Sequence, residues 1–163
     1  MPTCGTSERS SAVNVGSKME DMIRGRIMEA SQAAPGSIGD ILRFRVVSYD
    51  EEENICTMTC KTEPWMRNFA GTLHGGMGAT ILDQAMGIIA YCLKHGEGTA
   101  PAIQLTVNYH RPLIPGEAVR IKVRVVSVTR SFISLSAELT HAEHPDKVCL
   151  SSSGTYFYKP SEG

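Results

Sequence analysis

The sequence lacks the features that mark several specialised classes of protein. Its 163 residues carry a net charge of −1 at pH 7, so there is no excess of basic side chains that would indicate a general nucleic-acid binder. No apolar run reaches the roughly 18 residues that a bilayer-spanning helix needs, because Asp83 and Gln84 interrupt the longest apolar stretch. We therefore expect neither nucleic acid nor a membrane as a partner.

The first 17 residues also lack the pattern of a targeting signal. They contain no basic start followed by an apolar segment, as a secretory signal would, and we therefore expect a cytoplasmic protein. Large apolar side chains are almost absent from residues 1–17, so we predict a mobile tail there. Residues 18–163 are long enough to bury a core without disulfides and are assigned to a single domain.

The sequence contains few cysteines, and their number and spacing do not suggest disulfide bonds. The five cysteines, at positions 4, 56, 60, 92 and 149, are odd in number and form no Cys-x-x-Cys pair, which favours reduced thiols. Cys56 and Cys60 share one face of a predicted strand, and packing is a simpler role for them than metal binding. We predict no metal site and no cofactor.

The order of predicted elements indicates an α+β fold. Apolar residues recur at three- and four-residue steps in an N-terminal helix over residues 18–33, which Pro35 and Gly36 terminate. A second, strongly apolar helix is predicted from about Gly76 to Lys94. Alternating or β-branched segments predict strands over residues 41–49, 54–62, 102–111, 118–128, 132–141 and 148–158. The simplest packing is a hotdog fold, a curved antiparallel sheet wrapped around the long central helix.

Glycine concentrates at the start of the central helix, where Asn68-Phe-Ala-Gly-Thr-Leu-His74-Gly75-Gly76 leads into the apolar segment. The first N–H groups of a helix can stabilise an anion or a developing oxyanion. Asn68 and His74 lie close enough in sequence to reach this junction. The alternative, that both satisfy loop backbone groups and the glycines only serve a turn, stays open at this point.

Asp83 is a carboxylate in apolar surroundings. It lies nine residues beyond His74, so the two side chains point to opposite faces of one helix and are about 13 Å apart along its axis. If both serve one site, Asp83 must face the helix start of a second chain, which makes a homodimer necessary. The alternative is an aspartate satisfied by Thr80 or Gln84, or one that faces solvent.

The residues Asn68-x-x-Gly-Thr-Leu-His74-Gly75-Gly76 and Asp83, followed by Asn108-Tyr-His-Arg111-Pro, resemble the signature of the PaaI-like acyl-CoA thioesterases. This group of hotdog proteins includes the thioesterase superfamily member 2 type. The resemblance covers roughly residues 38–158. It implies hydrolysis of acyl-coenzyme A to the free acid and CoA, in a site shared by two subunits.

The resemblance also implies roles for individual residues. The N–H of Gly75, helped by Asn68, would polarise the thioester carbonyl, with Gly76 beside it. Asp83 of the partner chain would act as the general base, or conceivably as the nucleophile, and His74 would lie on the leaving-group side. Relatives place a Ser or Thr on the following strand to hold the water. Ala102 stands at that position here, with Thr99 or Gln104 as substitutes.

Arg111 follows the strand that should border the site, and its fork of donors suits the phosphates of CoA. Arg130 and Lys94 are weaker candidates, since solvated surface charge explains each of them. Four residues suit either an acyl pocket or core and dimer packing: Trp65, Met66, Phe69 and Met86.

These observations predict an acyl-CoA thioesterase that forms a homodimer, with assembly into a homotetramer left open. A hydratase would carry Asp followed five positions later by His, and no aspartate of this sequence does. A ligand sensor would need an output segment such as a DNA-binding helix pair, for which the tail and one helix are too little. The remaining alternative is a non-catalytic acyl-CoA binding protein within a larger complex.

Overall fold

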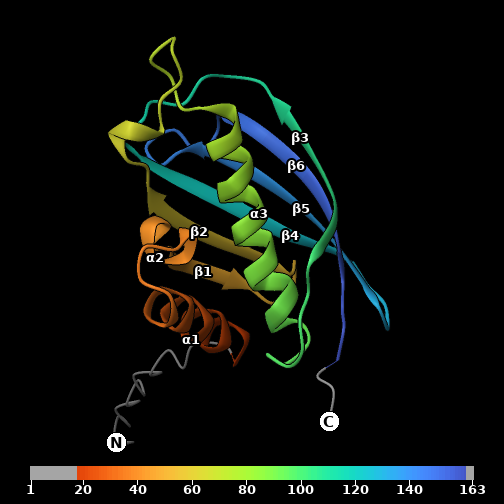
Figure 1. The fold of residues 1–163 in the computed structure, drawn as a ribbon. Coiled ribbons are helices and arrows are strands. Elements are labelled where there is room, and N and C mark those ends of the chain that lie inside the picture. The colour runs from red at the N-terminus through yellow and green to blue at the C-terminus, as the bar shows by residue number, and fades with distance from the viewer. Residues whose placement is uncertain (1–17, 161–163) are drawn as a thin grey trace, which may run out of the picture.

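The computed structural model describes residues 18–160, so the predicted tail over residues 1–17, including Cys4, lies outside the described residues. Three helices, one short 3-10 helix and six strands follow one another along this part of the chain (Figure 1). Their bounds are α1 Lys18–Ala33, α2 Ile38–Leu42, β1 Arg45–Asp50, β2 Ile55–Lys61, η1 Pro64–Met66, α3 Gly75–Cys92, β3 Ala102–Tyr109, β4 Ala118–Val128, β5 Phe132–His141 and β6 Val148–Phe157.

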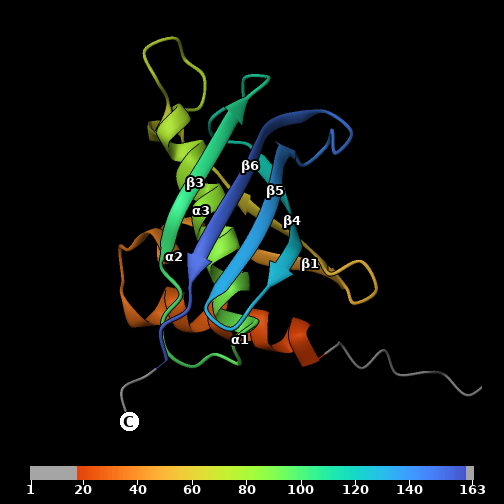
Figure 2. The ribbon, with the colours of Figure 1, turned by 90° about the vertical axis from the view of Figure 1, so that its right-hand side faces the viewer.

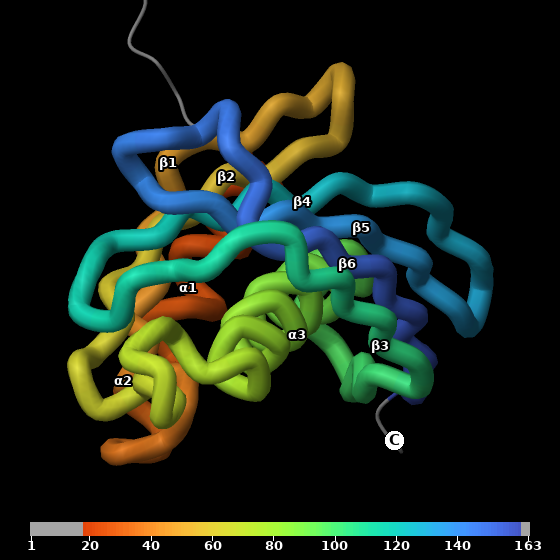
Figure 3. Tube along the Cα trace, turned by 90° about the horizontal axis from the view of Figure 1, so that it is seen from above, coloured from red at the N-terminus to blue at the C-terminus, as the bar shows by residue number. Residues whose placement is uncertain are grey.

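The strands form one antiparallel sheet in the order β1-β2-β4-β5-β6-β3. The sheet curves around α3, which lies along its concave side (Figures 1 and 3). Ile81, Leu82 and Met86 of α3 are fully buried against the alternate, inward-facing side chains of the strands. The opposite face of β3, β6, β5 and β4 is turned away from the helix (Figure 2). This arrangement confirms the predicted hotdog fold.

β3 does not pair with the strand that follows it in the sequence. β4, β5 and β6 pair consecutively, whereas β3 pairs with β6 at the edge of the sheet. The other side of β3 has no strand partner within residues 18–160. Most of its side chains are exposed, Ile103 and Tyr109 each by 57%.

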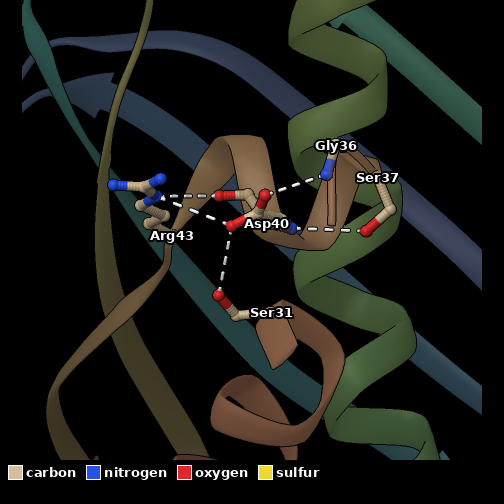
Figure 4. A network of polar contacts seen from close by, with 5 residues as sticks. All are labelled: Ser31, Gly36, Ser37, Asp40 and Arg43. Atoms are coloured by element: carbon tan, nitrogen blue, oxygen red, sulfur yellow. Dashed lines mark hydrogen bonds and ion pairs between the residues drawn. The ribbon is translucent and has the colours of Figure 1, made fainter. Parts of the chain in front are cut away.

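The strand predicted over residues 41–49 begins too early. Ile41 and Leu42 belong to α2, which Ser37 caps by accepting a hydrogen bond from the N–H of Asp40. The Asp40 carboxylate in turn accepts from the N–H of Gly36 at 2.9 Å (Figure 4). Arg43 then reverses the chain with a left-handed φ of 44°, and β1 starts at Arg45. The short helix escaped prediction because it depends on this local network rather than on an apolar period.

The described cysteines pack into the core. Cys56, Cys60, Cys92 and Cys149 are buried and form no disulfide with one another. Burial raises the pKa of Cys56 and Cys60 to about 12, so these thiols stay protonated. Within residues 18–160 no group of three His, Cys, Asp or Glu side chains is arranged to hold a metal ion. Among the described helices, none combines the length and apolar character required to cross a membrane.

Candidate active site

His74 is the N-cap of α3. Its Nδ1 accepts a hydrogen bond from the N–H of Gly76 at 2.9 Å, and its carbonyl accepts from the N–H of Met77 at 2.9 Å. Because Nδ1 is an acceptor here, the proton of the neutral ring lies on Nε2, which remains a free donor at the exposed side of the residue. The bond also occupies the N–H of Gly76, so that group is not available to a substrate.

Asn68 closes the loop that precedes α3. Its Oδ1 accepts hydrogen bonds from the N–H groups of Ala70 and Thr72, at 2.9 and 3.1 Å, and its Nδ2 donates to Thr72 Oγ1 at 2.9 Å. These three bonds confirm the interpretation in which the Asn68 side chain satisfies polar groups of its own loop. One Nδ2 hydrogen is left over, and it can still donate to a bound carbonyl.

The N–H of Gly75 is the first of α3, and it makes no hydrogen bond to any residue between 18 and 160. The Gly75 carbonyl accepts from the hydroxyl of Tyr109 at 3.0 Å. A Cβ at position 75 would lie 3.2 Å from Tyr109 Cε1, so a larger residue there would push this ring back by a few tenths of an ångström. An unpaired N–H at a helix start can stabilise negative charge on an oxygen.

These groups share one cavity of about 360 Å³. Four predicted site residues line it: Asn68, His74, Gly75 and Arg111. The guanidinium of Arg111 donates to the carbonyl of Val148 at 2.7 Å, which fixes the side chain at the cavity wall and leaves further donors free. Tyr109 also lines this cavity; it belongs to the motif at residues 108–112 but was assigned no role of its own from the sequence.

Asp83 lines a second cavity, of about 510 Å³. Its Oδ1 accepts a hydrogen bond from the hydroxyl of Tyr156 at 2.9 Å. Burial, reinforced by the charge of Asp83 and by this hydrogen bond, raises the pKa of Tyr156 well above its ordinary value. Tyr156 therefore stays a donor and holds the carboxylate in place. Thr80 does not serve Asp83, since its hydroxyl donates to the carbonyl of Gly76 instead.

The remaining predicted residues lie at the Asp83 cavity, in the core or at the surface. Thr99 and Ala102 line the Asp83 cavity, whereas Gln104 does not and donates its amide to Thr106 on the exposed strand β3. Thr99 is thus the better placed of the two substitutes for a water-holding residue. Met66 and Met86 are buried in the core, whereas Trp65 and Phe69 are exposed and line neither cavity. Lys94 donates to the carbonyl of Thr129.

One chain therefore presents two separate cavities, each lined by predicted site residues. The helix-start cavity and the Asp83 cavity share no lining residue, although both open beside α3. This separation is what the nine-residue spacing of His74 and Asp83 predicts.

Comparison with known proteins identifies the family of this chain. The family model described as thioesterase superfamily matches residues 70–147, from the Gly-rich loop to the β5–β6 turn. Acyl-coenzyme A thioesterase 13 of Homo sapiens is 31% identical over 101 residues, which are 61% of this chain and 69% of that protein. The chain belongs to the thioesterase superfamily. The resemblance predicted from the His-Gly-Gly junction is confirmed.

Solved structures support the fold of this thioesterase superfamily member. Thioesterase superfamily member 2 from Mus musculus superposes with a TM-score of 0.69 at 21% identity, over 86% of this chain and 98% of that one. A protein of Streptococcus mutans, solved bound to acetyl CoA, superposes with a TM-score of 0.61 at 21% identity, over 74% of this chain and 91% of that one. At these identities the likeness establishes the hotdog fold alone.

Proposed function

We propose that this thioesterase superfamily member hydrolyses the thioester of an acyl-coenzyme A to the free acid and CoA. The observation that carries the proposal is the pair of half-sites. The N–H of Gly75 at the start of α3 has no hydrogen-bond partner within residues 18–160, and the Asp83 carboxylate is held by Tyr156 in a separate cavity. The human relative is named an acyl-CoA thioesterase, and the Streptococcus mutans structure contains acetyl CoA, which support the same substrate class.

The proposal includes a homodimer in which each site takes one half from each chain. β3 supports this assembly, because it is an edge strand with one side unpaired within residues 18–160 and with exposed apolar side chains. Such an edge favours pairing with a second copy. Pairing of this kind would bring the start of one α3 toward the Asp83 cavity of the other chain.

In the proposed mechanism, these groups carry out the hydrolysis together. The thioester carbonyl oxygen accepts from Gly75 N–H and from the spare amide hydrogen of Asn68, and Asp83 of the other chain takes a proton from water. The water oxygen forms a bond to the carbonyl carbon, and the C–S bond then breaks. The proton reaches the departing CoA sulfur, beside which His74 Nε2–H would lie. Thr99, which lines the Asp83 cavity, would orient the water in the absence of a hydroxyl at Ala102.

A panel of acyl-CoA esters tests the function, with release of the free thiol as the readout. Aryl, phenylacetyl, hydroxylated aromatic and medium or long fatty acyl esters should all be included, and we expect hydrolysis of at least one class. Ester binding without thiol release across the whole panel would contradict the hydrolase. It would favour the alternative of a non-catalytic acyl-CoA binding protein.

Arg111→Ala should raise KM for CoA esters by about tenfold with little change in kcat, because the lost guanidinium would bind the CoA phosphates equally in the ground and transition states. Steady-state kinetics on the best ester of the panel measures this effect. Arg124→Ala is the matched control, since Arg124 is also an exposed arginine but pairs with Glu53 away from both cavities. An unchanged KM in Arg111→Ala would move the phosphate site elsewhere.

A further inference from the structure

The Asp83 cavity extends along one face of α3. Asp83, Gly87 and Tyr91 all line it, and their four-residue spacing places them on the same side of the helix. Tyr91 lies eight positions beyond Asp83, which corresponds to a rise of about 12 Å along the helix. A Cβ at Gly87 would have only one neighbour within 4 Å, Tyr156 Cε1 at 3.8 Å, so the space beside this glycine is open. The cavity is therefore a groove that starts at the proposed base and ends at Tyr91.

Arg26 of α1 lies at the Tyr91 end of this groove. Its guanidinium carbon is 4.3 Å from the centre of the Tyr91 ring, and the side chain also lines the cavity. A guanidinium stacked on an aromatic face keeps its N–H groups free at the edge, where they can bind a carboxylate in the plane. Glu29 approaches only to 3.6 Å and is mostly exposed, so this weak ion pair can give way to a ligand.

Charged side chains of both signs line the groove. Among residues 18–160, Asp83 is the only acid that lines it, and Arg26 is the only base. Gln84 and Thr99 add polar groups to its walls. An acyl chain with an apolar end would offer no acceptor to the N–H groups at the edge of this guanidinium, whereas an anionic end would pair with them.

We propose that the acyl group hydrolysed by this protein carries a carboxylate at its far end, and that Arg26 binds that carboxylate. The substrates would then be CoA thioesters of dicarboxylic acids. This inference rests on the proposed function, because it takes the groove beside Asp83 as the acyl pocket. It also gives α1 a part in selecting the substrate.

The test compares suberoyl-CoA with octanoyl-CoA, its counterpart without the terminal carboxylate. We expect a higher kcat/KM for suberoyl-CoA in the native protein. Arg26→Leu should lower kcat/KM for suberoyl-CoA by about tenfold or more and leave octanoyl-CoA nearly unchanged. Arg24→Leu is the matched control, because Arg24 lies on the same helix, pairs with Glu20 and does not line the groove. Thermal melts of both variants report the integrity of α1.

Several results would overturn the inference. Equal losses on both esters in Arg26→Leu would mean that Arg26 serves CoA or the stability of the fold. A native preference for octanoyl-CoA would exclude a carboxylate-selective groove. If no ester of any kind is hydrolysed, the proposed function fails, and calorimetric titration with suberate monomethyl ester, whose second end is neutral like the thioester beside Asp83, still decides the groove. Binding that Arg26→Leu abolishes supports the carboxylate site, and absence of binding to the native protein rejects it.

Discussion

Replacement of Asp83 by Asn is expected to lower the turnover of acyl-CoA by about 100-fold or more, because a neutral amide cannot take a proton from the attacking water. The fold should be retained. Asp83 is only partly buried, and the amide oxygen of Asn can still accept the hydrogen bond from Tyr156. The measurement is kcat on the best ester of the panel, together with the thermal unfolding midpoint and the oligomeric state by light scattering.

Glu138→Gln provides the matched control for that variant. Glu138 is an exposed carboxylate of β5 that lines neither the helix-start cavity nor the Asp83 groove. The same chemical change there should leave kcat unaltered. Full activity of Asp83→Asn with native assembly would remove Asp83 from the mechanism. A loss of activity that follows a loss of folded protein would instead assign the residue a structural role.

The elements that were predicted most accurately are those with the clearest period. Strands over residues 118–128 and 132–141 were predicted with the bounds that the structure has, because alternate residues face the core and solvent. The central helix was also predicted to within a few residues. Its apolar sequence required a surrounding sheet, and this requirement together with the element order led to the hotdog fold.

The site was predicted less completely, because some of its partners are distant in sequence. Tyr156 holds Asp83 across 73 positions of chain. From the sequence alone, Tyr156 cannot be distinguished from the other inward-facing residues of the last strand. Only the pairing order β5-β6-β3 brings it beside α3. Tyr109 is similar, since its bond to Gly75 depends on where the edge strand β3 ends. Pairing order is a tertiary property that local periodicity does not contain.

The shared site predicts that two inactive variants restore each other. Asp83→Asn lacks the base, and Asn68→Ala damages the loop and the carbonyl site at the helix start. When equal amounts exchange subunits at random, half of the dimers are mixed, and each mixed dimer has one intact site of two. Activity should therefore recover to about a quarter of the native value, measured after mixing under conditions where exchange is complete.

A second mixture separates this result from a site within one chain. Native protein mixed equally with the double variant Asp83→Asn/Asn68→Ala forms mixed dimers in which both shared sites are damaged, so only the native dimers work. A shared site thus predicts about a quarter of native activity in both mixtures. A site within one chain predicts no recovery in the first mixture and about half in the second. The two mixtures together distinguish the geometries without any assumption about the acyl group, because each measurement is a ratio to the native protein on the same ester.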